Sequence, residues 1–158
     1  MTEKLYDKNA YLFEFDARVL SCTETKRGFE IILDRTAFFP EEGGQDCDSG
    51  MIGGARVTHV SLLGDKIVHL TDTEVSGNVR CTLDGDTRFD RMQQHTGEHI
   101  VCGIVHRLYG YENVGFHLGD DETTFDFDGP LTKKQLSEIE ELANRAVTQN
   151  LPVRGDYP

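Results

Sequence analysis

The chain has 158 residues, of which 37% are hydrophobic and 28% are charged, and its formal net charge is −12. This length and composition predict a soluble globular protein with one domain or two small subdomains. The negative charge argues against broad nonspecific affinity for nucleic acid, because phosphate binding depends on Lys and Arg. The N-terminal residues contain no apolar run as long as a signal peptide or a membrane span, so we expect a cytoplasmic protein without a membrane partner.

Residues 13 to 83 carry the pattern of short strands, in which apolar residues alternate with charged ones and turn residues follow at intervals. The expected strands are residues 13–19, 29–33, 56–62, 67–70 and 78–83, with hairpin turns at 25–28 and 63–66 and a closing turn at Asp84 and Gly85. About six strands at this spacing predict a small antiparallel β-barrel.

Within this region lies a glycine-rich stretch, Thr36 to Gly50, with the sequence TAFFPEEGGQDCDSG. An aromatic pair and Pro40 precede Gly43 and Gly44, which indicates a tight turn whose backbone can lie close to a ligand. Gln45 adds a hydrogen-bond donor and an acceptor to this turn. The alternative is a surface loop in which the glycines only permit the turn and Gln45 is solvated.

The stretch from Arg91 to Tyr109 predicts a helix with Asp90 as its N-cap. His95 and His99 are four residues apart, so they lie on one face of this helix, close enough to bind one metal ion. The alternative is that both are hydrogen-bonded members of an ordinary helix. The spacing alone does not distinguish a metal site from an ordinary helix, since a chain with six His residues contains such a pair by chance in roughly one case in five.

After this helix, residues 114–118 and 123–127 predict a hairpin, and a capping box at Thr132 and Gln135 precedes an amphipathic helix that ends near Asn150. From residue 151 onward the sequence predicts a strand that the end of the chain cuts short. The expected fold class is therefore α+β, with a glycine-rich β-barrel subdomain at residues 1–86 followed by an α+β subdomain at residues 87–158. The four cysteines form no CxxC pair, so we expect reduced, mostly buried thiols.

The glycine-rich stretch and the histidine pair, in this order, resemble the motifs of a known family. Thr36 to Gly50 is similar to the segment T-x-F-[FY]-P-x-x-G-G-Q-x-x-D-x-G of the alanyl-tRNA synthetase editing domain and its freestanding AlaX-type relatives. Met92 to Ile100, MQQHTGEHI, is similar to the HxxxH motif of that family at the expected distance downstream. The resemblance continues through residues 114–119 and 126–128 and so covers nearly the whole chain.

The resemblance implies a hydrolase that removes serine or glycine from mischarged tRNA(Ala), in a family whose synthetase members also bind ATP. It implies a zinc ion held by His95 and His99, together with a Cys and a His from a later CxxxH motif. That later motif is missing, so we expect an N-terminal fragment whose remaining zinc ligands lie beyond residue 158 and which is inactive alone. Cys102 and His106 match CxxxH as a string but continue the same helix. His95 to His106 spans about 16 Å, too far for one ion to bind all four side chains.

By the same resemblance, Thr36 would hydrogen-bond the hydroxyl of a misattached serine, and Gly43, Gly44 and Gln45 would shape the pocket for the aminoacyl end. His117 is expected to be a third ligand or a substrate contact, the alternative being a strand histidine without such a role. The basic residues expected to contact the tRNA are Arg80, Arg88, Arg91, Lys133 and Lys134. The oligomeric state is left open.

Two other functions are compatible with the same residues. His95, Glu98 and His99 also spell HxxEH, the signature of an inverted zinc peptidase in which Glu98 would be the general base. For an editing enzyme, by contrast, we expect Glu98→Gln to leave deacylation largely intact. The second alternative is a non-catalytic module that binds tRNA or oligomerises, with histidines that only pack.

Overall fold

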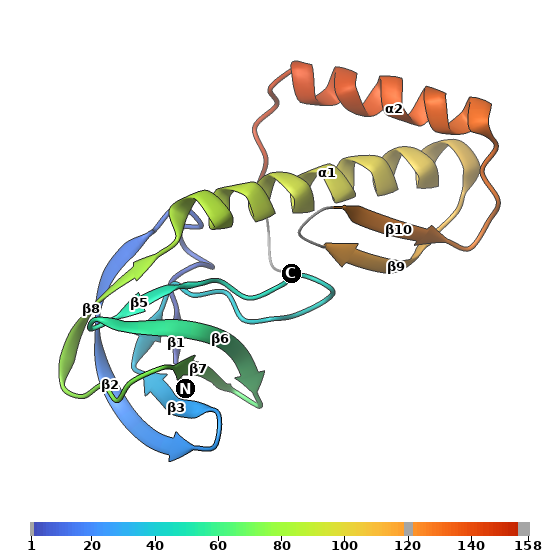
Figure 1. Cartoon of the computed structure of the whole chain (residues 1–158). Helices are drawn as coiled ribbons and strands as arrows, with labels where there is room; N and C mark the ends of the chain where they lie inside the picture. The colour runs from blue at the N-terminus through green and yellow to red at the C-terminus, as the bar shows by residue number, and fades with distance from the viewer. Residues whose placement is uncertain (1, 119–121, 155–158) are drawn as a thin grey trace. The chain divides into compact units, whose positions relative to one another are not determined.

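Figure 1 shows the computed structural model of the chain, which describes residues 2–118 and 122–154. The chain forms two compact units, Met1–Met92 and Gln93–Pro158. The strands are β1 (Glu3–Lys4), β2 (Glu14–Thr25), β3 (Gly28–Leu33), β4 (Arg35–Thr36), β5 (Gly50–Ile52), β6 (Ala55–Leu63), β7 (Lys66–Thr71), β8 (Asn78–Leu83), β9 (Asn113–Leu118) and β10 (Thr123–Phe127). The helices are α1 (Gly85–Tyr109) and α2 (Lys133–Thr148). The subdomain boundary expected after residue 86 and the boundary between the two units both fall within α1.

The first unit is built around a closed barrel with the strand order β2-β3-β7-β6-β5-β8. Every pair in the barrel is antiparallel, and the short strand β1 pairs in parallel with β4 outside it. The two hairpin turns expected from the sequence join β2 to β3 and β6 to β7. The predicted antiparallel barrel and the α+β class are therefore confirmed.

The alternating sequence pattern gives the strands an apolar face that points into the barrel, and the pairing of β2 with β8 closes the barrel. In β8, Val79, Cys81 and Leu83 are buried while their neighbours are exposed. The inward side chains form one core, which includes Ile31, Leu33, Phe38, Ile52, Val57, Val60 and Ile67. At Gly28, with φ of 129°, an added Cβ would lie 2.4 Å from the carbonyl oxygen of Thr71, so the hairpin needs glycine there.

Helix α1 begins at Gly85 rather than at Arg91, so Asp90 lies inside the helix and the prediction that it is the N-cap is wrong. Asp84 begins the helix instead: its Oδ1 accepts a hydrogen bond from the Thr87 N–H at 3.2 Å, and its carbonyl accepts one from the Arg88 N–H at 3.0 Å. The expected closing turn at Asp84 and Gly85 is therefore the N-terminus of a helix. The apolar pattern of the sequence does not reveal this first turn, because the side chain that the turn buries is the charged Arg88 and not an apolar residue.

The second unit contains the predicted hairpin, in which β9 and β10 pair antiparallel with Phe116 opposite Phe125. The residues that connect the two strands, 119–121, lie outside the described part of the chain. Helix α2 packs against the C-terminal half of α1 through a small core centred on Ile104, Val105 and Ile139.

The predicted capping box of α2 is confirmed. The Thr132 hydroxyl accepts a hydrogen bond from the Gln135 N–H at 3.4 Å, and the Gln135 side-chain oxygen accepts one from the Thr132 N–H at 2.9 Å. After α2, residues 151–154 form neither helix nor strand, so the strand expected from residue 151 does not begin there. The rest of that expected strand, residues 155–158, lies outside the described residues.

The burial of the cysteines differs from the expectation. All four thiols are free, but only Cys81 is buried; Cys47 and Cys102 are half-buried, and Cys22 is exposed. Cys22 lies in the distal part of β2, where residues 20–24 are all exposed. Over the described residues, neither helix combines the length and apolar character needed to span a membrane.

Candidate functional site

The histidine pair lies on α1, as the sequence predicted, and the helix brings the two imidazoles together. Their ring centroids are 4.9 Å apart, and the ring planes are stacked at 24°. This is the geometry of residues four apart on one helical face. His95 is half-buried and also lies near Phe116 of β9, with ring centroids 6.1 Å apart, whereas the side chain of His99 is 73% exposed. The pair is therefore reachable from solvent on one side and supported by the hairpin on the other.

Glu98 is the residue of this cluster that the sequence reasoning did not assign to the metal site. It is only 8% exposed. Its Oε1 accepts hydrogen bonds from the Asn113 side-chain amide at 2.9 Å and from the Cys102 thiol at 3.3 Å. Its Oε2 lies 3.3 Å from Nδ1 of His99. The sequence feature that could have identified Glu98 is its position three residues after His95, which places both residues on the same face of the helix.

The donor atoms of His95, Glu98 and His99 all lie within 4.8 Å of one another. Imidazole nitrogens and a carboxylate oxygen are ligands that zinc takes in proteins, and two histidines with a glutamate occur in catalytic zinc sites. These three residues thus fit a metal ion by their chemistry and spacing.

Local electrostatics favour neutral imidazole at His95. Burial lowers its pKa, the neighbouring His99 lowers it further, and Glu98 acts in the opposite direction. A neutral imidazole keeps the lone pair that a metal ligand needs. At Cys102, burial and then the hydrogen bond to Glu98 raise the pKa of the thiol to about 11. Cys102 is therefore a protonated thiol that donates a hydrogen bond to Glu98.

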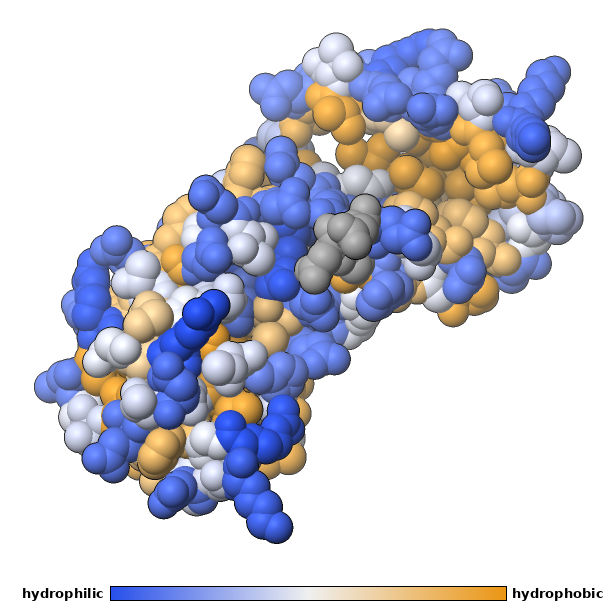
Figure 2. All heavy atoms as spheres, viewed as in Figure 1, coloured by the Kyte–Doolittle hydropathy of each residue, from blue (hydrophilic) through white to orange (hydrophobic). Residues whose placement is uncertain are grey.

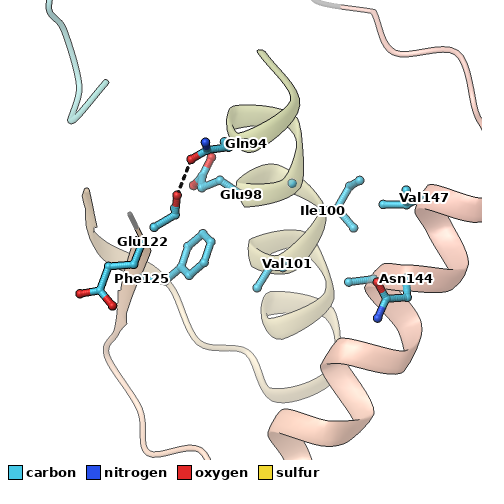
Figure 3. Close-up of a pocket in the computed structure, with 11 residues that line it drawn as sticks. Gln94, Glu98, Ile100, Val101, Glu122, Phe125, Asn144 and Val147 are labelled. Atoms are coloured by element: carbon cyan, nitrogen blue, oxygen red, sulfur yellow. Dashed lines mark hydrogen bonds between the residues drawn. The ribbon is translucent and has the colours of Figure 1, made fainter. Parts of the chain in front are cut away.

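A pocket of about 420 Å³ lies beside this cluster, within the second unit. Its apolar lining comes from α1, β10 and α2, with Ile100, Val101, Phe125 and Val147. Figure 3 shows Gln94 and Glu98 projecting from α1 on the side of Phe125, and Ile100 projecting toward α2. The Thr123 hydroxyl donates a hydrogen bond to the side-chain oxygen of Gln94 at 2.7 Å, which ties β10 to α1 at one end of the pocket. Figure 2 shows hydrophobic residues gathered on this part of the second unit, below the hydrophilic outer face of α2.

The glycine-rich stretch forms a long loop after β4, with a tight turn at its tip. The N–H groups of Glu42 and Gln45 each donate to the carbonyl of the other residue, at 3.2 and 3.0 Å. Gly43 and Gly44 between them have φ of 62° and 86°, the left-handed values that a two-residue turn of this kind requires. Gln45 is buried rather than solvated, with 8% exposure, so the surface-loop alternative does not describe it.

Thr36 is completely buried at the base of this loop. Its Oγ1 lies 2.9 Å from Nε2 of His69 and accepts a hydrogen bond from the Phe38 N–H at 3.1 Å. Nδ1 of His69 faces the carbonyl oxygen of Ile31 at 3.2 Å. The structure thus brings Thr36 together with a buried histidine that the sequence reasoning did not single out.

A buried ion pair closes the neck of the same loop. The Phe39 N–H donates to Oδ2 of Asp48 at 2.6 Å, and the Asp48 N–H donates to the Phe39 carbonyl at 3.0 Å. Asp48 in turn pairs with Arg88 of α1, whose Nε donates to Oδ1 at 2.9 Å. Arg88 also donates to the carbonyls of Ala10 and Ala37. The expectation that Arg88 contacts tRNA is wrong, because its side chain is only 5% exposed and is fully engaged by these partners.

The remaining predicted residues are placed as follows. His117 lies on β9 with an exposed side chain, opposite Thr124 in the hairpin register. Arg80 forms exposed ion pairs with Glu14 and Asp16. The side chain of Arg91 is 15% exposed and donates to the carbonyl of Cys47. Lys133 and Lys134 are exposed in the first turn of α2. The structure thus unites His95 with His99 in the second unit, and Gly43 and Gly44 with Gln45 in the first.

The barrel and the α+β unit, with two imidazoles and a carboxylate clustered on α1, define a two-unit α+β protein with a candidate catalytic metal centre. No protein-family model matches the chain. Among curated proteins, the chain is 35% identical to the alanyl-tRNA editing protein AlaX-M of Methanosarcina acetivorans, over 97% of this chain and 68% of that protein. The chain belongs to the alanyl-tRNA editing protein family.

Other relatives are longer. The alanine–tRNA ligase of Ignicoccus hospitalis is 35% identical over 97% of this chain, which corresponds to 18% of the ligase. The alanyl-tRNA editing protein Aarsd1-A of Xenopus laevis is 34% identical over 92% of this chain and 39% of its own length. The chain therefore spans less than half of the length of these two relatives. Both are alanine-tRNA proteins by name, as is the Methanosarcina protein, which gives the peptidase alternative no support.

Proposed function

We propose that this protein is a trans-editing enzyme that hydrolyses the ester bond of mischarged tRNA(Ala), carrying serine or glycine, at a zinc site that includes His95 and His99. The observation that carries the proposal is the 35% identity to the AlaX-M editing protein over 97% of this chain. The stacked imidazole pair on α1 supports it independently, since the ring centroids are 4.9 Å apart on one helical face. A tRNA-editing role also favours a cytoplasmic protein.

The residues of α1 would hold the ion and orient it toward the substrate ester. A bound zinc ion supplies a Lewis acid that polarises an ester carbonyl and lowers the pKa of a water molecule. His95 contributes a neutral imidazole, because burial and His99 lower its pKa. The pocket of about 420 Å³ next to Glu98 offers an apolar surface for the end of the aminoacyl-tRNA, in the size range of small-molecule sites.

We assign substrate binding to Thr36, Gly43, Gly44, Gln45 and His117. The left-handed Gly43–Gly44 turn leaves its backbone uncovered by side chains, so a ligand can approach it closely. Thr36 is completely buried and its hydroxyl is already bonded to His69 and Phe38, so its contact with a serine hydroxyl rests on the family resemblance and not on exposure of the side chain. His117 offers an exposed imidazole on β9 as a substrate contact.

The test combines zinc content with deacylation of seryl-tRNA(Ala) and glycyl-tRNA(Ala) by the purified full-length protein. We expect His95→Ala and His99→Ala to remove the zinc and to lower the deacylation rate by at least about 100-fold, because each removes a ligand. The matched control is His106→Ala, which changes an exposed histidine on the same helix and should keep both zinc and activity. Zinc-loaded protein that leaves both esters intact would refute the proposed function.

A further inference from the structure

We propose that Glu98 binds the positively charged α-amino group of the misattached amino acid, and that it thereby makes the enzyme selective for esters that carry such a group. This inference rests on the proposed function and adds a substrate contact to it. By the family resemblance, the zinc ligands other than His95 and His99 come from a later CxxxH motif, which leaves Glu98 for a different role. The inference reverses the expectation from the sequence that Glu98→Gln leaves deacylation largely intact.

The carboxylate of Glu98 is buried and fixed in place by groups without a permanent charge. It is only 8% exposed. Its Oε1 accepts hydrogen bonds from the Asn113 amide at 2.9 Å and from the Cys102 thiol at 3.3 Å, and its Oε2 lies 3.3 Å from Nδ1 of His99. An amide, a thiol and an imidazole carry no fixed positive charge. Because a buried carboxylate is costly without a counter-charge, these surroundings favour a cationic ligand.

Glu98 also lines a cavity in which a small cationic group fits. The pocket of about 420 Å³ combines the polar side chains of Gln94, Glu98 and Thr123 with an apolar lining that includes Ile100 and Val101. Figure 3 shows Gln94 and Glu98 one turn apart on the same side of α1. The hydrogen bond from Thr123 to the side-chain oxygen of Gln94, at 2.7 Å, holds this polar region together. A ligand with a cationic head and a small uncharged body matches such a lining.

The pocket has a second carboxylate, Glu122, which is the other candidate for the same contact. Glu122 is exposed, whereas Glu98 is buried and held by two donors. An ion pair with an exposed carboxylate is screened by water and contributes little, while a charged hydrogen bond to a buried and fixed carboxylate is strong. The ammonium group therefore pairs with Glu98.

This contact defines which esters the enzyme accepts. Serine and glycine both carry the α-amino group, so Glu98 binds either residue and does not distinguish them. In a peptidyl-tRNA the same nitrogen is part of an amide and has no positive charge. Such an ester would leave the buried carboxylate without its partner, which costs binding energy. The contact thus spares esters whose α-nitrogen is acylated.

The experiment compares two esters that differ only at the α-position. Seryl-tRNA(Ala) has an ammonium group there, and glyceryl-tRNA(Ala), made from it by deamination with nitrous acid, has a hydroxyl. At about pH 6.5, where the α-amino group is protonated, kcat/KM of the full-length wild type should be about 10- to 100-fold higher for the seryl ester. Glu98→Gln should lose this preference by hydrolysing the seryl ester more slowly. Its zinc content and its rate on the glyceryl ester should stay unchanged.

The matched control is Glu122→Gln, which removes the exposed carboxylate of the same pocket and should keep the wild-type preference. Circular dichroism verifies that each variant folds. The comparison of the two esters with the wild type needs no variant, and equal rates on both would overturn the inference. An equal loss of preference in Glu122→Gln would also overturn it, since the pocket would then act only through its total charge.

The remaining outcomes separate a substrate contact from a role at the metal. If Glu98→Gln loses zinc or slows both esters equally, Glu98 acts on His99 or the metal, and the inference is wrong. If Glu98→Gln keeps the wild-type preference, the α-amino group binds elsewhere and the inference is again wrong, although the editing function stands. If the zinc-loaded wild type hydrolyses neither ester, the proposed function itself fails.

Discussion

At the scale of single residues, His69 has a defined protonation state that follows from its two neighbours. The carbonyl oxygen of Ile31 only accepts hydrogen bonds, so Nδ1 of His69 carries the proton. Nε2 is then an acceptor, and the Thr36 hydroxyl donates to it. Complete burial opposes the charged form and lowers the pKa of His69 to about 4. His69 is therefore neutral in the folded protein across the physiological range.

This pKa predicts a loss of stability in mild acid. The unfolded chain, in which His69 has its ordinary pKa of 6.5, binds a proton at higher pH than the folded chain, in which the pKa is about 4. Between these values the unfolded state holds more protons, so the free energy of unfolding falls as the pH falls from 6.5 toward 4. The shift corresponds to about 3 kcal/mol.

The measurement is urea denaturation of the wild type and of His69→Gln at several pH values across this window. Glutamine cannot take up the proton, so the variant should show a smaller decrease in stability on acidification, although it is less stable at pH 7. The control His117→Gln alters an exposed histidine and should retain the wild-type slope. Equal slopes for wild type and His69→Gln would contradict the assigned protonation state.

At the scale of elements, the glycine-rich loop depends on one buried ion pair. Asp48 closes the loop neck through Phe39 and binds Arg88 of α1, and the side chains of Asp48 and Arg88 are 3% and 5% exposed. We expect Asp48→Asn to destabilise the protein by about 3–5 kcal/mol, because it leaves a buried guanidinium without its counter-charge. Chemical denaturation measures this loss.

The matched control for the ion pair is Asp46→Asn in the same loop. The Asp46 side chain is 54% exposed and lies 3.8 Å from Arg91, so its replacement should change stability by no more than about 0.5 kcal/mol. An Asp48→Asn variant as stable as Asp46→Asn would show that the pair does not hold the loop. A double replacement, Asp48→Leu with Arg88→Met, should recover part of the loss, because it removes both buried charges together.

The apolar pattern of the sequence could locate the C-terminal part of helix α1 but not its start. Its C-terminal part was predictable, since Ile100 and Ile104 are four residues apart, and Ile104 and Val105 are buried. Its first turn was not, because that turn is fixed by the Asp84 cap and by the burial of Arg88 against Asp48, forty residues earlier in the chain. Helix α2 was predictable at its start, because its capping box is local in sequence.

At the scale of the whole molecule, the four cysteines lie in both units and differ in how deeply they are buried. The thiolate is the reactive form of cysteine. Burial raises the pKa of Cys81 to about 12 and that of Cys102 to about 11, and it also raises the pKa of Cys47, whereas Cys22 is exposed. We expect iodoacetamide at pH 8 to modify Cys22 first and Cys81 only after unfolding. Peptide mass spectrometry over time gives the order.

A Cys22→Ser variant provides the control for this labelling experiment, because it should lose the fast phase and leave the slower ones unchanged. Modification of Cys81 in the folded protein at the rate of Cys22 would contradict the burial of β8 in the barrel core.

The barrel, the hairpin and the histidine pair were predictable because each leaves a short-range periodic signal. Alternation along β8, the turn at Gly28 and the four-residue spacing of His95 and His99 are all visible within a few residues. The burial of Glu98 was not visible, since it depends on Asn113, which β9 brings back to α1. The partnership of Thr36 with His69 likewise depends on strands that are distant in sequence.

The hydrogen bonds between Phe39 and Asp48 hold together the two ends of the loop segment between these residues. A chain closed in this way can change length at its tip while the barrel below stays the same, since each doubling of a flexible loop costs only about 0.6 kcal/mol of closure entropy. Insertions next to Gly43 and Gly44 should therefore be tolerated far better than insertions beside Asp48. New recognition loops could arise by mutation at this tip without a new scaffold.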